Sequence, residues 1–234
     1  MSGTELWAVI PAAGRGTRFG GDVPKQYLEV AGRPLIAHAL QALLAHPRVA
    51  GAMVALSPDD ARWPGWTQWN GKPVIRCVGG GERADSVLAA LHALPAQVDD
   101  NTLVLVHDAA RPNLRGTDLD RLIAVAEAAE HGAILAAPVR DTLKRAGEGD
   151  RIAATQSREG LWRAFTPQAF RRGALTAALE QAPLDGVVVT DEAMAMERTG
   201  ARPALVEGRE DNLKVTTAAD LALAEYLLSL RDPR

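Results

Sequence analysis

Short apolar runs alternate with amphipathic helical patterns along most of this 234-residue chain. Residues 51–56, 102–106 and 132–139 form apolar runs with the length of buried strands. Next to them, residues 34–45 and 82–94 carry apolar side chains at the spacing of helices that cover one face of a sheet. Because strands that alternate with helices form parallel sheets, the pattern predicts an α/β fold with a mostly parallel, twisted sheet and helices on both faces.

The later part of the chain continues this alternation with shorter elements. Thr117, with Asp120 three residues later, is the predicted N-cap of one helix. The remaining predictions are a helix over residues 169–181, short strands over 187–189 and 203–206, a helix that begins near Thr190-Asp191-Glu192 and ends at Gly200, and a last helix over 216–230.

The size, charge and cysteine content of the chain restrict its domain number and the classes of partner that it can bind. A length of 234 residues, with 47% apolar and 24% charged residues, predicts one globular domain, residues 1–234. A net charge of −3 gives no basic patch for a nucleic acid, and the single cysteine, Cys77, excludes an intramolecular disulfide. The sequence shows neither a signal-peptide pattern nor an apolar stretch of ~20 residues, so we expect a cytoplasmic protein without a membrane partner.

Residues 140–166 interrupt the alternation. Residues 142–145 and 151–155 flank the turn sequence Gly147-Glu148-Gly149-Asp150, which predicts a β-hairpin. An isolated two-stranded ribbon has marginal stability in water. We therefore expect this segment to be an inserted β-arm that packs against another surface, such as a second subunit.

The first predicted strand, residues 6–10, leads into a glycine-rich loop that extends to Gln26. Glycines let a backbone approach a ligand closely, and consecutive N–H groups in such a loop form an anion site. A P-loop is excluded because the chain has no Gly-Lys-Ser/Thr sequence, and a dinucleotide fingerprint is excluded because Phe19 stands at the third glycine position. The loop combines four glycines with three cations, which favours a polyphosphate ligand: Gly14, Gly16, Gly20, Gly21, Arg15, Arg18 and Lys25.

Three more segments are expected at the same carboxyl edge of the sheet, where ligands bind in open α/β folds. Residues 79–86 form a second glycine turn before a helix, whose free amides suit an anion or the edge of a base. Asp108 follows the most apolar strand and suits a magnesium ion that bridges a triphosphate. The adjacent His107 should point to the other face and is interpreted as structural. Lys214 follows the last strand.

The same segments also have simpler interpretations. The second glycine turn can be a plain tight turn, Asp108 can cap its own turn beside Arg111, and Lys214 can be solvated surface. Trp63, Trp66 and Trp69 lie in one connection, where indole packing is the common case, so no function is assigned to them. The chain has no Ser/His/Asp or Cys/His arrangement, and covalent catalysis is not supported.

Taken together, seven segments resemble the 2-C-methyl-D-erythritol 4-phosphate cytidylyltransferase family, which serves the non-mevalonate isoprenoid pathway. They match in order and spacing from about Leu6 to Leu228: PAAGRGTRFGGDVPKQYL, GGGERADSV, LVHDAARP, ILAAPVRDTLKR, FTPQ, VTDEA and EGREDNLKVTTAADLALAE. The first segment alone is shared by many nucleotidyltransferases, whereas the others narrow the resemblance to this family.

The resemblance implies a Rossmann-like nucleotidyltransferase fold, a homodimer with a swapped β-arm, and the use of CTP with Mg²⁺. It assigns Pro11, Ala12, Ala13, Gly14, Arg15, Gly16, Arg18 and Lys25 to the triphosphate, Gly80, Gly81, Arg83 and Ser86 to cytosine and ribose, and Asp108 to the metal and to both substrates. Gly81 departs from the pattern, because many relatives are expected to carry a larger, often acidic residue there.

The resemblance also implies an acceptor site and a mechanism. The phosphate of methylerythritol phosphate is expected to attack the α-phosphorus of CTP directly, with catalysis by Arg18, Lys25 and Lys214. The implied acceptor contacts are Asp108, Arg111, Thr142, Arg158, Thr166, Thr190 and Lys214, with Thr142 and Arg158 from the neighbouring subunit.

Three alternatives remain at this level. A cytidylyltransferase for another polyol phosphate, such as ribitol 5-phosphate, would share the CTP segments. A non-catalytic nucleotide-binding domain is less favoured, because it would not need Arg18, Lys25, Asp108 and Lys214 together. A glycosyltransferase would require an Asp-x-Asp metal motif, which the chain lacks.

Overall fold

The computed structural model describes residues 5–14 and 23–231. Its centre is an eight-stranded sheet in the order β12-β8-β11-β7-β1-β4-β6-β5. The β1–β4, β1–β7, β4–β6 and β8–β12 pairs are parallel, so the predicted mostly parallel α/β sheet is confirmed. The strands are β1 (Leu6–Ala12), β4 (Val49–Leu56), β5 (Gln68–Trp69), β6 (Lys72–Val78), β7 (Leu103–Val106), β8 (Ala133–Pro138), β11 (Trp162–Arg171) and β12 (Ala204–Glu207).

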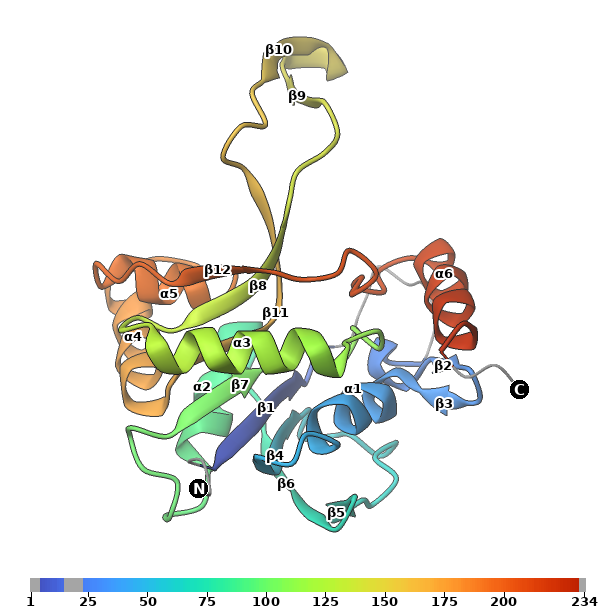
Figure 1. Cartoon of the computed structure of the whole chain (residues 1–234), viewed down its shortest axis with the longest axis vertical. Coiled ribbons are helices and arrows are strands. Elements are labelled where there is room, and N and C mark those ends of the chain that lie inside the picture. Colours follow the sequence, from blue (N-terminus) through green and yellow to red (C-terminus); the bar gives the residue numbers. More distant parts are fainter. Residues whose placement is uncertain (1–4, 15–22, 232–234) are drawn as a thin grey trace.

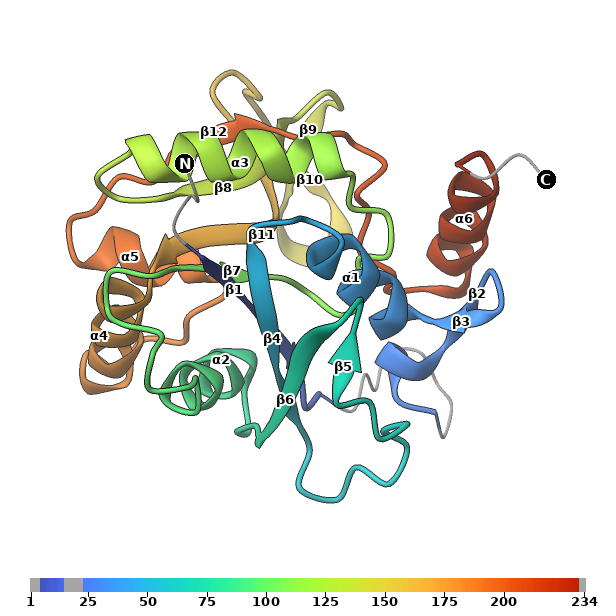
Figure 2. The ribbon, with the colours of Figure 1, turned by 60° about the horizontal axis from the view of Figure 1, so that its bottom comes forward.

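Helices cover both faces of this sheet (Figure 2). Alternate residues of β1 therefore pack against different helices. Ala8 and Ile10 pack in one core cluster with α1 and α3, whereas Trp7 and Val9 pack in another with α2, α4 and α5. The helices are α1 (Leu35–Leu44), α2 (Arg83–His92), α3 (Gly116–Ala128), α4 (Arg172–Leu184), α5 (Glu192–Arg198) and α6 (Ala218–Ser229). Of these, α6 packs on the small hairpin of β2 (Glu29–Val30) and β3 (Arg33–Pro34).

The predicted helix over residues 169–181 is wrong at its start. Ala169 and Phe170 belong to β11, which runs antiparallel between β7 and β8, and α4 begins only at Arg172. Residues 165–170 are all buried, so the pairing of β11 on both edges overrides the local helical spacing.

Two shorter predictions are also wrong. Residues 187–189 form no strand, because Val188 is 78% exposed and the segment pairs with no strand of the described sheet. Thr117 is not an N-cap: α3 begins at Gly116 with Arg115 in the cap position. The buried carboxylate of Asp118 instead accepts the N–H of Arg209, which ties α3 to the segment after β12.

The predicted β-hairpin is confirmed, and it projects far from the body of the molecule (Figure 1). It consists of β9 (Leu143–Ala146), a short turn (Glu148–Asp150) and β10 (Ile152–Gln156), and all five residues of β10 are exposed. At its base, Trp162 of β11 pairs with Pro138 of β8, so the arm extends two strands of the central sheet.

The three tryptophans pack against one another as predicted. The rings of Trp63 and Trp66 pack edge to face with their centroids 5.3 Å apart, and those of Trp66 and Trp69 do so with centroids 4.9 Å apart. Trp69 also donates its indole N–H to Gln41 of α1. Among the described residues, no helix has the length and apolarity needed to cross a membrane.

Candidate active site

Two adjoining pockets lie at the carboxyl edge of the sheet. The first pocket lies where the loop after β1, the turn before α2 and the end of β7 meet, and it brings together most of the residues predicted for CTP. It is lined by Pro11, Ala12, Ala13, Gly14, Lys25, Gln26, Gly80, Gly81, Glu82, Arg83, Ser86, Asp108, Ala109, Ala110 and Lys214.

The second pocket lies between β11, the start of α5 and the end of β7. It brings together the predicted acceptor residues of the body of the chain. Its lining is Arg83, Asp108, Arg111, Ala164, Phe165, Thr166, Gln168, Thr190, Asp191 and Lys214. Arg83, Asp108 and Lys214 line both pockets and therefore form the boundary between them.

Asp108 holds three cations at this boundary. Its side chain is 8% exposed; Oδ1 accepts Arg83 Nε at 3.0 Å, and Oδ2 accepts Lys214 Nζ at 3.0 Å and Arg111 Nε at 3.3 Å. Burial alone would raise the pKa of Asp108, but the attraction of Arg83, Lys214 and Arg111 outweighs burial and holds this pKa well below its usual range. The carboxylate is therefore ionised and gathers positive charge where two anionic substrates would meet.

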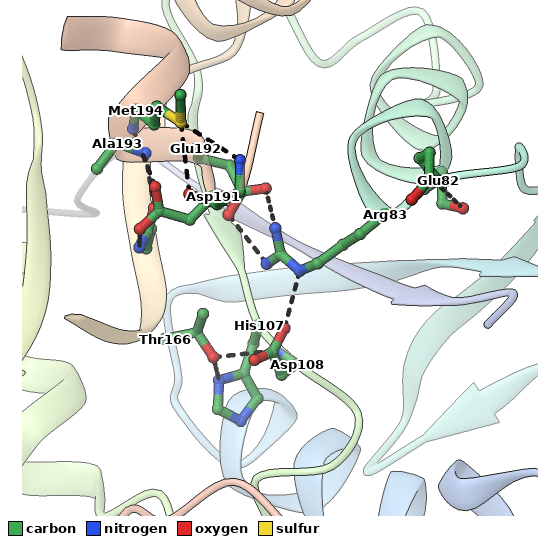
Figure 3. A network of polar contacts seen from close by, with 12 residues as sticks. Glu82, Arg83, His107, Asp108, Thr166, Asp191, Glu192, Ala193 and Met194 are labelled. Atoms are coloured by element: carbon green, nitrogen blue, oxygen red, sulfur yellow. Dashed lines mark hydrogen bonds and ion pairs between the residues drawn. The ribbon is translucent and has the colours of Figure 1, made fainter. Parts of the chain in front are cut away.

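Arg83 is fixed from two sides (Figure 3). Besides Asp108, its guanidinium binds Glu192, with Nη1 at 2.6 Å from Oε1 and Nη2 at 3.0 Å from Oε2. Sequence reasoning treated Glu192 only as part of a helix start. The available signal was an acidic residue two positions after Thr190, but its partner, Arg83, lies 109 residues away in the chain.

Arg111 connects the end of β7 to the segment that carries Lys214. Its Nη1 donates to the carbonyl of Asn212 at 2.8 Å, and the Asn212 side chain donates to the carbonyl of Thr166 at 2.8 Å. Asn212 is fully buried, although the sequence did not single it out. These bonds place Lys214, two residues later, beside Asp108.

Thr166 and Thr190 lie in the second pocket with different degrees of exposure. Thr166 is 4% exposed, and its hydroxyl accepts the N–H of Asp108 at 3.0 Å and contacts His107 Nδ1 at 3.0 Å, as Figure 3 shows. Thr190 is exposed. His107 is fully buried, and burial lowers its pKa to about 4, so its ring is neutral at neutral pH. These contacts agree with a structural role for His107.

Lys25 lies in a short 3-10 helix, Lys25–Tyr27, that is held by its next two residues. Gln26 donates to the carbonyl of Ala12 at 2.8 Å, and Tyr27 donates its hydroxyl to Asp60 at 2.8 Å. Burial and the bond to Asp60 raise the pKa of Tyr27, which stays protonated. The turn thus fixes the backbone that presents Lys25 to the first pocket.

The turn before α2 shows why glycines are needed there. A Cβ on Gly79 would lie 2.6 Å from Ala13 Cβ, and a Cβ on Gly80 would lie 2.3 Å from Asp85 Cβ. The Asp85 side chain accepts the N–H of Glu82 at 3.0 Å in a capping box that starts α2. At Gly81, by contrast, the atom nearest to an added Cβ, Asp85 Oδ2, is 3.9 Å away, so a Cβ fits there.

This difference gives a matched pair of predictions. Gly80→Ala should shift the turn at a cost of about 1–3 kcal/mol and weaken CTP binding, because overpacking displaces the backbone that lines the first pocket. Gly81→Ala should leave CTP affinity and the unfolding temperature nearly unchanged. Calorimetric titration with CTP and thermal unfolding of both variants check the pair; equal losses in the two would contradict it.

Some predicted residues are not placed in these pockets. Arg15, Gly16 and Arg18 lie outside the described residues. Thr142 and Arg158 are exposed on the arm and line neither pocket of their own chain.

Comparisons with known proteins agree with this geometry. The family model described as 2-C-methyl-D-erythritol 4-phosphate cytidylyltransferase matches residues 6–230. A protein of that name from Stenotrophomonas maltophilia (strain R551-3) is 64% identical over 97% of each chain. One from Xanthomonas campestris pv. campestris (strain 8004) is 63% identical over 99% of this chain and 87% of the relative.

Solved structures extend the similarity to the fold. A crystal structure of 4-diphosphocytidyl-2C-methyl-D-erythritol synthase has a TM-score of 0.83 and 37% identity, over 96% of this chain and 99% of the other. The 2-C-methyl-D-erythritol 4-phosphate cytidylyltransferase of Thermus thermophilus has a TM-score of 0.77 and 33% identity, over 96% and 98%. A match of this extent in sequence and fold shows that the chain belongs to the 2-C-methyl-D-erythritol 4-phosphate cytidylyltransferase family.

Proposed function

We propose that the protein transfers CMP from CTP to 2-C-methyl-D-erythritol 4-phosphate, giving 4-diphosphocytidyl-2-C-methyl-D-erythritol and pyrophosphate for isoprenoid precursor synthesis. The observation that carries this proposal is the shared boundary of the two pockets, where Arg83 and Lys214 meet on Asp108. Family membership supports the identity of both substrates. We further propose that residues 1–234 form one nucleotidyltransferase domain with an inserted arm. The arm was expected over residues 140–166, of which residues 162–166 belong to β11 of the central sheet.

CTP is assigned to the first pocket and the acceptor to the second. The turn of Gly80 and Gly81 with Arg83 and Ser86 would hold cytosine and ribose, and the loop after β1 with Lys25 would hold the triphosphate. The second pocket offers Arg111, Thr166 and Thr190 to methylerythritol phosphate. The attacking phosphate and the α-phosphate of CTP would then meet beside Lys214.

The reaction is a direct in-line displacement. An oxygen of the acceptor phosphate forms a bond to the α-phosphorus of CTP, and the bond from that phosphorus to the oxygen bridging to the β-phosphate breaks. Pyrophosphate leaves with the bonding electrons, so no protein nucleophile is required. Because both reactants are polyanions, positioning and charge neutralisation carry the catalysis. Lys25 and Arg18 would stabilise the α-phosphate and pyrophosphate, and Lys214 would anchor the attacking phosphate.

Asp108 has one lone-pair site left that could bind a Mg²⁺ ion. A carboxylate has about four lone-pair sites, and Asp108 uses three of them for Arg83, Arg111 and Lys214. Within residues 5–14 and 23–231, no three His, Cys, Asp or Glu side chains gather into a metal site. Asp108 would therefore hold Mg²⁺ together with phosphate oxygens of CTP, as is common for this ion. When bound, the ion would offset negative charge on the phosphates.

The arm supports a homodimer in which each subunit completes the acceptor site of the other. Thr142 lies just before β9 and Arg158 just after β10, both are exposed, and neither lines either of the two pockets of its own chain. In such a dimer, Lys214 and the Arg158 that serves the same acceptor site come from different subunits.

Mixed dimers test this arrangement. Lys214→Met and Arg158→Met should each have low activity alone. After mixing and subunit exchange, about a quarter of the sites should be intact, because half of the dimers are mixed and each has one wild-type site. Activity measured against the mixing ratio checks this result, and no recovery after proven exchange would place Arg158 in its own subunit's site or in none.

The acceptor is tested by pyrophosphate release with CTP and Mg²⁺, using methylerythritol phosphate and ribitol 5-phosphate in parallel. Release with methylerythritol phosphate alone is the expected result. Release with ribitol 5-phosphate alone would keep the CTP site and change the pathway. A folded protein that binds CTP but is silent with both acceptors would be a non-catalytic nucleotide-binding domain. The expectation that the reaction takes place in the cytoplasm remains a prediction.

A further inference from the structure

The carboxylate of Glu192 lies next to both pockets but lines neither of them. Its side chain is 1% exposed, so it does not reach a ligand in either pocket. Both of its oxygens bind the guanidinium of Arg83, which does line both pockets. Arg83 is therefore the side chain through which Glu192 contacts the two pockets.

The contact between Glu192 and Arg83 fixes the orientation of the guanidinium as well as its position. Both oxygens of Glu192 accept from Arg83, at 2.6 and 3.0 Å, while Arg83 Nε donates to Asp108 at 3.0 Å. Paired bonds between a guanidinium and a carboxylate define the plane of the guanidinium, which a single bond does not. Arg83 is thus held in one orientation between Asp108 and Glu192 (Figure 3).

The backbone around Glu192 is also fixed. Glu192 is the first residue of α5, and Asp191 before it caps the helix by accepting the N–H of Met194 at 3.0 Å. Gln168 of the central strand β11 donates to Asp191 and accepts the N–H of Ala193, both at 2.8 Å. A buried strand therefore sets the position from which Glu192 reaches Arg83.

Charge explains why a carboxylate is needed at this place. Arg83, Arg111 and Lys214 all contact Asp108, so three positive side chains share one negative group. Like charges this close repel one another, and the repulsion would push the more exposed side chains towards solvent. Burial raises the pKa of Glu192, but both of its oxygens accept from the Arg83 guanidinium, as those of an ionised carboxylate do. Glu192 thus supplies a second negative charge on the side of Arg83, which offsets that repulsion.

We infer that Glu192 is a positioning residue that holds the Arg83 guanidinium at the boundary of the two pockets, so that donor and acceptor are aligned by one fixed side chain. This inference rests on the proposed transfer of CMP from CTP to a polyol phosphate. It adds a residue that touches neither substrate. The Arg83–Glu192 contact also links the start of α2, beside the CTP pocket, to the start of α5, beside the acceptor pocket.

Replacement of Glu192 by glutamine tests the inference, because it keeps the size of the side chain and removes its charge. Glu192→Gln should lower kcat/KM for CTP and for the acceptor by about 10- to 100-fold each, the effect of losing a hydrogen bond to a charged partner. Glu197→Gln is the matched control, since Glu197 is an exposed carboxylate of the same helix. It should keep wild-type kinetics and stability.

A double-mutant cycle separates positioning from a purely structural role. If Glu192 acts through Arg83, the Arg83→Gln/Glu192→Gln protein should be no less active than Arg83→Gln alone. If the losses of kcat/KM in the two single variants multiplied in the double variant, Glu192 would act by another route and the inference would be overturned. So would a Glu192→Gln protein with wild-type kinetics, or one with a lowered unfolding temperature and unchanged kinetics.

Two further arrangements keep the test decisive. If Glu192→Gln does not fold, the comparison of Arg83→Gln with the double variant still decides, because removing both partners of a buried pair is tolerated better than removing one. The wild-type assay distinguishes the two proposals: an inactive wild type would refute the proposed function, whereas an active wild type with multiplying losses would refute only the role of Glu192.

Discussion

Lys214→Met is expected to lower kcat by about 10²- to 10³-fold while the protein stays folded. Lys214 lines both pockets, and its ammonium group lies 3.0 Å from Asp108 Oδ2 at their boundary. Two polyanions must approach each other there, and methionine fills a similar volume without a charge. The fold should tolerate the change, because Arg83 and Arg111 remain beside Asp108 and the Lys214 side chain is already 38% exposed.

Single-turnover measurements with CTP and methylerythritol phosphate check the effect on the chemical step. Lys72→Met is a suitable control, because Lys72 lies at the start of β6, donates to the carbonyl of His46 and lines neither pocket. It should keep wild-type turnover. If Lys214→Met turned over at a near-normal rate, the ammonium group would not act on the reacting phosphates.

Asp108→Asn should lower both stability and activity. The substitution leaves Arg83, Arg111 and Lys214 together without the carboxylate that they share, and breaking a buried ion pair by removing one partner costs about 3–5 kcal/mol. Arg83 and Lys214 are partly exposed and can turn towards water, so we expect a loss near 3 kcal/mol. For a domain of this size, that loss lowers the unfolding midpoint by about 6–12 °C.

Thermal unfolding at neutral pH measures this effect. Asp185→Asn is the control, because Asp185 forms an exposed ion pair with Arg198 and its removal should leave the midpoint nearly unchanged. Added pyrophosphate should raise the midpoint of Asp108→Asn more than that of the wild type, since an anion can replace the lost charge among the three cations. An unchanged midpoint without added anion would show that the three cations do not depend on Asp108.

Local patterns were sufficient for much of the fold. The length and spacing of apolar residues predicted α1, α2, β4 and β7, because a strand or helix that packs on the core shows its period in the sequence. The glycine turn at Gly80 could also be recognised from its run of glycines before a helix. The structure gives the reason for this glycine, because Asp85 comes too close to leave room for a Cβ. The hairpin was predicted from its turn residues, without any apolar pattern.

Two of the wrong predictions, those for residues 169–170 and Thr117, have a common cause. Ala169 and Phe170 were assigned to a helix because their spacing suits one, and only the edges of β7 and β8 draw them into β11. Thr117 looked like a cap, but α3 begins one residue earlier, and its buried Asp118 binds the N–H of Arg209, 91 residues away. In each case a partner distant in the sequence decided the local structure.

The candidate site likewise has features that the sequence predicted and features that only the structure revealed. The sequence by itself determined which chemical groups follow the strands, and hence that phosphates were the expected ligands, because glycines, cations and a carboxylate stand at strand ends where a parallel sheet collects them. The tertiary structure alone decided that Arg83, Lys214 and Arg111 meet on Asp108 and that Glu192 holds Arg83. These contacts join residues up to 109 positions apart. The spacing of residues along the sequence does not predict them, because they depend on the order of the strands and on the burial of opposite charges in one place.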